Sequence, residues 1–453
     1  MSTAYILIIV ITAVSLLLIM VLKLKISAFI SLLITAILVG LMTGMPLDGI
    51  MKSIQEGMGG TLGFVAIVVG LGAIFGQVLE SSGGAESLAH HLVKKFGKEK
   101  ASWAMVITGF IVAIPVFFDV GLVILVPIIY ALSRDTKRSM LYYGIPLLTG
   151  LAVTHSFIPP TPGPVAVAEI LGASLGWVIV FGFILGIPVA IIAGPVFGSF
   201  ISRKIDIEPP AEIIPSDNAE AKRVEKFPSF RSVALLIAVP LVLILVNTFT
   251  SLAVEKKIFE KSLFTDALIF LGHPFSALII AALLAIYFLG IRRGKSRQEL
   301  LDLSTKALGP AGIIILITGA GGVLKQVLVD SGIGEIMAAS ISGSAMPSIV
   351  LAWLLAAIVR VTQGSATVAM ITAAGLIAPV LEFINPSAPE LALIVLAIAS
   401  GATLLSHVND SGFWLVSKYF GMDVKQTLRS WTVMESIIAV CGLGFTLLAS
   451  LFV

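Results

Sequence analysis

The chain has 453 residues, of which 58% are hydrophobic and only 12% are charged. A soluble protein carries about 25% charged residues, so this composition excludes an ordinary water-soluble domain and indicates a surface that faces lipid. The formal net charge of +3 is small, and no nucleic-acid partner is expected. The lone cysteine, Cys441, excludes an internal disulfide framework and a thiolate metal site, and we expect neither a metal nor a cofactor.

Long apolar segments recur along the chain. Among them are Ala4 to Val21, Phe29 to Leu41, Leu175 to Val196, Val233 to Val246 and Ile437 to Val453. The longer segments can each cross a hydrocarbon core of about 30 Å as a helix, which satisfies its own backbone hydrogen bonds in lipid. No basic region precedes the first segment, so it is expected to be a retained helix and not a signal peptide. The sequence predicts an all-α polytopic membrane protein.

An internal repeat divides the chain. Residues 72–86 (GAIFGQVLESSGGAE) align with residues 321–335 (GGVLKQVLVDSGIGE), and the same order of segments follows each copy. The identities fall at Gly72, Gln77, Val78, Leu79, Ser82, Gly83 and Glu86. We therefore predict two repeats, residues 1–205 and 228–453, joined by a cytoplasmic linker at 206–227.

Each half contains a long apolar stretch with a break at its centre, at about 103–132 and about 347–381. Such a stretch is either one tilted span or a re-entrant hairpin that returns to the same side. If residues 103–132 crossed the membrane, the basic clusters Lys94–Lys100 and Arg134–Arg138 would lie on opposite faces, against the positive-inside rule. Hairpins in both halves leave five crossings each, and an odd number inverts the second repeat relative to the first. Paired hairpins and broken helices are typical of secondary transporters.

The two predicted hairpin tips carry candidate site residues. Asp119, in the first tip, is a carboxylate at membrane depth and therefore a candidate proton carrier, although it can equally cap a helix. The second tip offers short donors and bare N–H groups to an anion. Its candidates are Arg360, Gln363, Gly364, Ser365 and Thr367. Arg360 can bind a substrate carboxylate, neutralise a protein Asp or extend to the surface.

A broken helix follows each hairpin, at about 140–165 and about 390–415. In the first, a helix is expected to end at Thr154-His155, and four prolines and a glycine within residues 159–164 are expected to be non-helical, either around a wet cavity or as a surface loop. Its candidates for binding substrate are Thr154, His155, Ser156 and Thr161. In the second, the candidates are Asn409 and Ser411 for substrate and His407 and Asp410 for the proton. His407 and Asp410 are spaced so that they can share a proton as a coupled pair.

These segments resemble the gluconate permease (GntP) family, within the wider ion transporter superfamily. The resemblance covers essentially the whole chain and rests on residues 319–332, Gly364-Ser-Ala-Thr-Val-Ala369, Thr154-His-Ser-Phe-Ile-Pro-Pro160 and residues 407–414. It implies a bacterial inner-membrane homodimer of the elevator type that imports gluconate or a related sugar acid by proton symport. One branch of the family carries D-serine, which is the alternative substrate. Two positions depart from the family pattern, since Thr161 stands in place of a histidine and Ser411 in place of a proline.

Other classes of membrane protein fit the sequence less well. A channel needs no inverted repeat with paired breaks. A membrane-embedded enzyme is disfavoured because neither an HExxH nor a GxSxG motif accompanies His407 and Asp410. An ATP-driven pump would need a GxxxxGK[ST] motif, which the sequence lacks. The sequence thus predicts a transporter of a small organic anion and not an enzyme.

Overall fold

The computed structural model describes residues 3–209, 227–333 and 347–453, and within these ranges the chain is helical without a strand. Eight helical segments of the described part are long and apolar enough to cross a membrane. Large apolar side chains cover the outside; Leu263, for example, is 88% exposed. Such a surface is stable in lipid and not in water, so the chain is a multi-pass membrane protein.

The first half begins with two helices that pack against each other, α1 (Thr3–Leu22) and α2 (Ala28–Met42), and continues into the long helix α3 (Leu47–Ser81). It then contains α4 (Gly84–Phe96), α5 (Ala101–Val112), α6 (Phe118–Thr136), α7 (Leu141–Phe157), α8 (Pro162–Leu171), α9 (Leu175–Ile191) and α10 (Phe197–Ile201). Most of the predicted linker, residues 210–226, lies outside the described residues.

The second half repeats this order of long helix, interrupted stretch and closing helix. Its helices are α12 (Phe230–Glu255), α13 (Leu263–Gly272), α14 (Pro274–Ala285), α15 (Arg297–Asp330), α17 (Ser348–Gln363), α18 (Ala366–Ile384), α19 (Ala388–Gly401), α20 (Ser411–Phe420), α21 (Val424–Thr427) and α22 (Val433–Ala449). Glu335, the last residue of the predicted sequence repeat, lies outside the described residues.

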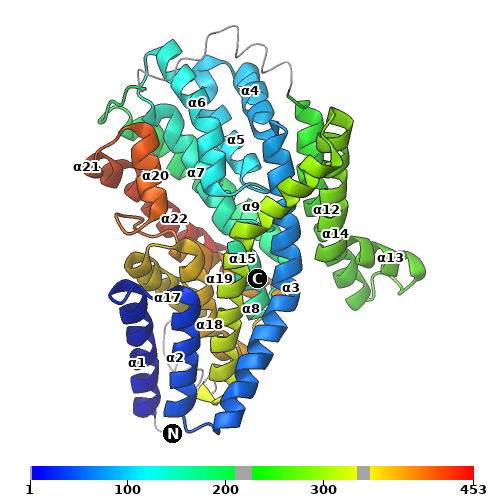
Figure 1. Ribbon diagram of the computed structural model, residues 1–453, viewed down its shortest axis with the longest axis vertical. Coiled ribbons are helices and arrows are strands. Elements are labelled where there is room, and N and C mark those ends of the chain that lie inside the picture. The colour runs from blue at the N-terminus through cyan, green and yellow to red at the C-terminus, as the bar shows by residue number, and fades with distance from the viewer. Residues whose placement is uncertain (1–2, 210–226, 334–346) are drawn as a thin grey trace.

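The long helices α3 and α15 lie side by side through much of the molecule (Figure 1). They run antiparallel, because Gly57 of α3 meets Gly322 of α15 whereas Gly70, further along α3, meets Leu308 near the start of α15. Glycine at the contact lets the two backbones approach closely, as small residues do between membrane helices. The two copies of the sequence repeat therefore lie on helices of opposite direction.

Residues 101–136 reverse direction in the middle. Helix α5 ends at Val112, and α6 begins at Phe118 after a turn that contains Pro115, which has no N–H to continue a helix. The outer ends of the two helices meet through ion pairs, Lys98 Nζ to Asp135 Oδ2 at 2.8 Å and Arg138 Nη2 to Glu99 Oε2 at 3.6 Å. Both ends of this stretch thus lie together, and Figure 1 shows α4, α5 and α6 grouped at one end of the molecule, opposite α1 and α2.

The remaining breaks differ in detail from the sequence prediction. Only residues 158–161 are non-helical in the proline-rich segment, so the expectation that residues 159–164 cannot be helical is wrong from Pro162 onward. Pro162 opens α8, where a missing N–H is harmless because the first N–H groups of a helix have no partner inside it. In the second half α19 ends at Gly401, before Ser406 and His407, and residues 402–410 form the break.

Candidate functional site

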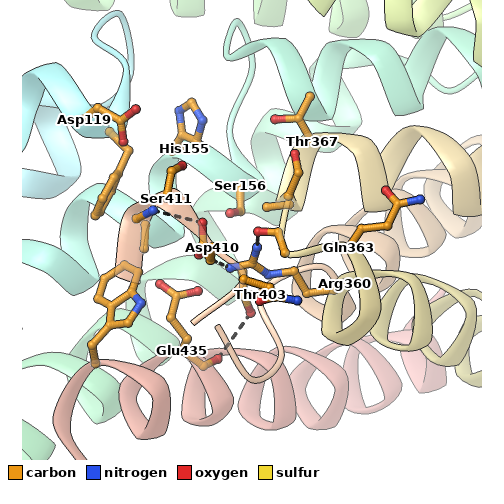
Figure 2. Close-up of a pocket in the computed structure, with 18 residues that line it drawn as sticks. Asp119, His155, Ser156, Arg360, Gln363, Thr367, Thr403, Asp410, Ser411 and Glu435 are labelled. Carbon is orange, nitrogen blue, oxygen red and sulfur yellow. Dashed lines mark hydrogen bonds and ion pairs between the residues drawn. The ribbon is translucent and has the colours of Figure 1, made fainter. Parts of the chain in front are cut away.

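The interrupted segments surround one polar cavity of about 340 Å³. Its lining comprises Phe118, Asp119, Ala152, His155, Ser156, Arg360, Gln363, Gly364, Ser365, Ala366, Thr367, Thr403, Asn409, Asp410, Ser411, Gly412, Trp431 and Glu435. Figure 2 shows these side chains converging from elements that are distant in sequence. Most of the residues that the sequence singled out as site candidates are therefore brought together in space.

Three helices present their first residues to this cavity. Phe118 and Asp119 begin α6, Ser365 caps α18, and Asp410 caps α20. The N-terminus of a helix carries free N–H groups and the positive end of the helix dipole, each equivalent to roughly half an elementary charge. Convergence of three such ends favours negative charge in the cavity, and two of the ends already carry a carboxylate, Asp119 in the first turn of α6 and Asp410 at the cap of α20.

The break between α17 and α18 fits against the break between α19 and α20. Gly364 ends α17 with a left-handed φ of +81°, and a Cβ atom there would lie 2.6 Å from the carbonyl carbon of Asn409. The Asn409 amide donates to the Val361 oxygen at 2.9 Å and to the Thr362 oxygen at 3.2 Å. These bonds satisfy carbonyls that the end of α17 leaves free. Only glycine fits at position 364, and close packing and the Asn409 hydrogen bonds hold the two breaks together.

Arg360 and Asp410 form an ion pair at the base of the cavity. The Arg360 guanidinium is 3% exposed, and its Nη2 lies 2.5 Å from Asp410 Oδ2. Its Nη1 donates to the carbonyl oxygen of Gly364. Of the roles left open by the sequence, the structure places Arg360 beside a protein Asp and away from the surface.

The Asp410 carboxylate is saturated with donors. Ser406 Oγ also donates to Oδ2 at 2.5 Å, and the Gly412 N–H donates to Oδ1 at 2.9 Å. His407 bonds elsewhere, because its Nε2 lies 2.9 Å from the Val361 oxygen. The predicted His407–Asp410 pair is therefore not formed, since each side chain holds a different segment in place.

Several polar atoms at the cavity have no hydrogen-bond partner within the described part of the chain. They are both amide atoms of Gln363, Nδ1 of His155 and Nε of Arg360. Leaving a buried polar group without a partner costs about 1–3 kcal/mol, and such groups are rare unless a ligand or water completes them. The cavity thus offers donors and acceptors suited to a polar solute.

Three of the predicted site residues do not line this cavity. Thr154 lies in α7 with its hydroxyl buried and unpartnered. The Thr161 hydroxyl donates to the Ile158 oxygen at 2.6 Å and lines a much smaller space next to α3. His407 bonds to α17, as described above. Their positions make them supports for the cavity wall rather than groups that face a solute.

The structure also adds residues that sequence reasoning missed. Glu435, in the first turn of α22, is 4% exposed and lines the cavity, as do Thr403 and the aromatic pair Phe118 and Trp431, whose rings are 5.4 Å apart. The sequence could have indicated Glu435, because it is an acidic residue within the apolar segment that follows Trp431. Within the described residues no cluster of three or more His, Cys, Asp or Glu side chains is arranged to hold a metal ion.

A multi-pass membrane protein whose broken helices enclose a buried polar cavity has the arrangement of a secondary transporter. Comparison with known proteins agrees, because residues 5–452 match the model of the GntP family permease. The chain belongs to the GntP family, and as a permease it is a transporter and not an enzyme.

Curated relatives align along nearly the whole chain. It is 42% identical to the gluconate permease of Bacillus licheniformis, over 96% of this chain and 97% of the relative. It is 38% identical to the Gnt-II system L-idonate transporter of Escherichia coli (strain K12), again over 96% and 97% of the two chains. Among solved structures, the Alcanivorax borkumensis YdaH transporter, described as having an unusual topology, matches with a TM-score of 0.65 at 13% identity, covering 92% of this chain and 96% of that one. That likeness concerns the fold alone.

Proposed function

We propose that this protein imports gluconate or a closely related sugar acid across the bacterial inner membrane together with protons. The observation that carries the proposal is the cavity, where three helix N-termini and unpartnered polar atoms meet. A sugar acid combines one carboxylate with several hydroxyls, which is the chemistry that such a lining complements. The substrates named for two relatives point the same way, since gluconate and L-idonate are both six-carbon sugar acids.

The substrate carboxylate is proposed to lie at the N-terminus of α18. There Ser365 and Thr367 supply hydroxyls, and the free N–H groups of the first turn supply donors. Gln363 and His155, whose buried polar atoms lack partners among the described residues, would bond the sugar hydroxyls. Ser156, Asn409 and Ser411 complete the wall, and Arg360 acts through Asp410.

A proton is proposed to accompany the anion. Moving an anion into a buried site is unfavourable unless its charge is balanced. The sequence candidates for carrying the proton are Asp119, Asp410 and His407, and the first two line the cavity. Loading proton and anion together leaves the net charge of the moving part of the protein unchanged, which lowers the barrier to crossing.

The architecture proposed for this transport is an inverted repeat with two re-entrant hairpins, moving as an elevator in a homodimer. The antiparallel course of α3 and α15 supports the inversion. The ion pairs between Lys98 and Asp135 and between Arg138 and Glu99 support a first hairpin that returns to its starting side. The basic residues at that base support a cytoplasmic location for it.

Uptake into proteoliposomes tests the function. Labelled gluconate should accumulate above its external concentration when the outside is more acidic than the inside, and should respond to a sodium gradient no more than to potassium. Accumulation against a concentration gradient excludes a channel. Sodium-driven uptake, or uptake that equilibrates without accumulating, would contradict proton symport.

The runner-up substrate is D-serine, which also carries a carboxylate and a hydroxyl. A thermal-shift series with gluconate, L-idonate, D-serine and citrate separates the two. Saturation at one hundred times the Kd stabilises a folded protein by about 2.7 kcal/mol. We expect the two sugar acids to raise the melting temperature and D-serine to leave it unchanged; the reverse order would favour the amino acid.

A further inference from the structure

A buried carboxylate outside the segments singled out by sequence stands beside the Arg360–Asp410 pair. Glu435 lies in the first turn of α22, is 4% exposed and lines the cavity. Figure 2 shows its carboxylate directed toward Arg360 and Asp410. A buried carboxylate is stable only if it is paired or protonated.

Two carboxylates, those of Asp410 and Glu435, lie beside one arginine, Arg360. Among the described residues that line the cavity, Arg360 is the one lysine or arginine, and Asp410 already lies 2.5 Å from it. With both carboxylates ionised, the group of Arg360, Asp410 and Glu435 carries one net negative charge. An anionic substrate adds a second. One proton taken up with the anion cancels the charge that the anion adds, and by linkage each then increases the affinity for the other.

The structure distinguishes the carboxylates that can take this proton. Asp410 accepts from Arg360, Ser406 and the Gly412 N–H, so protonation would displace donors that hold α17 and α20 together. Asp119, at the start of α6, is the most exposed of the three side chains. Glu435 is buried. The Thr403 hydroxyl donates to the backbone oxygen of Glu435 at 3.3 Å and not to its carboxylate. Protonation of the Glu435 carboxylate therefore displaces fewer hydrogen bonds than protonation of Asp410 would.

The groups around Glu435 limit the alternatives. Those at the cavity are Arg360 on α17, Asp410 before α20, Asp119 on α6 and His155 on α7. The helices α9 and α19 also pack against α22. The sequence of α9 has no titratable residue, and that of α19 has only Glu390, in the capping box at its start. Of the remaining titratable residues nearby in sequence, Arg429 is exposed and Cys441 lies two turns further along α22.

We propose that Glu435 binds the coupling proton, and that Arg360 and Asp410 set its affinity for that proton. This inference rests on the proton symport proposed above and names the group responsible. In the empty, proton-free site Glu435 shares the positive charge of Arg360 with Asp410. When the anion enters, Glu435 takes one proton, and it releases that proton after the anion leaves.

The test compares Glu435→Gln with the wild type and with Glu260→Gln, which removes an exposed carboxylate far from the cavity in sequence. If one proton binds with each anion, the Kd of the wild type for gluconate rises about tenfold per pH unit above its midpoint. Glu435→Gln should bind with a Kd independent of pH. It should also exchange labelled for unlabelled gluconate across the membrane, yet lose at least 90% of the accumulation driven by a pH gradient. Glu260→Gln should behave as the wild type.

Further outcomes separate this inference from the function on which it rests. If the wild type shows no uptake driven by a pH gradient, proton symport itself is refuted. If the wild type is driven and Glu435→Gln accumulates gluconate equally well, only the assignment to Glu435 is overturned, and His155 becomes the next group to test. If Glu435→Gln does not fold, Glu435→Asp decides: a carboxylate moved by one methylene should keep coupling but shift the pH midpoint of binding, and an unchanged midpoint overturns the proposal.

Discussion

Replacing Gly364 with alanine tests how closely the two chain breaks must fit. Gly364 has a φ of +81°, and a left-handed conformation costs other residues about 1–2 kcal/mol. The added methyl would also lie 2.6 Å from the carbonyl carbon of Asn409 and 2.9 Å from its Cγ, whereas ordinary contact begins at 3.4 Å. Transport can tolerate the backbone strain alone. It cannot tolerate the steric overlap with Asn409, because relieving that overlap moves one chain break away from the other by roughly 1 Å. A displacement of that size at a site can reduce its rate about 100-fold.

We therefore expect Gly364→Ala to lower the initial rate of gluconate uptake by about 100-fold at concentrations below KM. The matched control is Gly172→Ala. Gly172 ends α8 with a similar φ of +72°, but nothing lies within 4 Å of the position of its Cβ. This control carries the same backbone strain without the overlap, so its uptake should stay within about threefold of the wild type.

The assay is uptake of labelled gluconate into proteoliposomes containing equal amounts of protein, with melting temperatures measured on the same preparations. Both variants should melt at slightly lower temperatures. If Gly364→Ala transports at the rate of the Gly172→Ala control, the two breaks are not coupled and the description of the site is mistaken.

Three further predictions follow from individual side chains. Arg360→Met leaves the buried carboxylate of Asp410 without its cation and should destabilise the protein by about 3–5 kcal/mol, measured by thermal unfolding; an unchanged melting temperature would contradict the ion pair. Gln363→Leu removes two unpartnered polar atoms, so it should weaken gluconate binding at least tenfold without lowering the melting temperature; lower stability with unchanged Kd would show that the amide is structural. Single cysteines at Lys98 and at Lys137, each in a Cys441→Ser background, should both react with an impermeant maleimide from the cytoplasmic side, whereas labelling from opposite sides would refute the hairpin.

Much of the site could be predicted from the sequence because helix breaks leave a local signature. Gly364 and Ser365 interrupt an apolar run, and Asp119 follows a proline, so each break is visible without knowledge of its neighbours. The order of these segments in the two halves indicated that they meet. Helix ends were harder to predict, since Pro159 and Pro160 lie in the break after α7 whereas Pro162 starts α8.

The contacts between segments could not be read from the sequence. Arg360 and Asp410 are 50 positions apart, and three roles for the arginine remained possible until the fold was known. His407 was expected to pair with Asp410 by spacing, but the backbone between them turns, and the ring bonds to Val361 instead. Glu435 was missed because a single acid in the first turn of an apolar helix is also what helix capping produces.

The convergence of three helix N-termini on the cavity has a consequence for how substrates can change. In the proposed site, recognition of negative charge rests largely on peptide groups, which a point mutation does not remove. Discrimination among stereoisomers of the carbon chain falls instead to a few hydroxyl and amide side chains. A new sugar acid can therefore be accommodated by exchanging those side chains while affinity for the acid group persists.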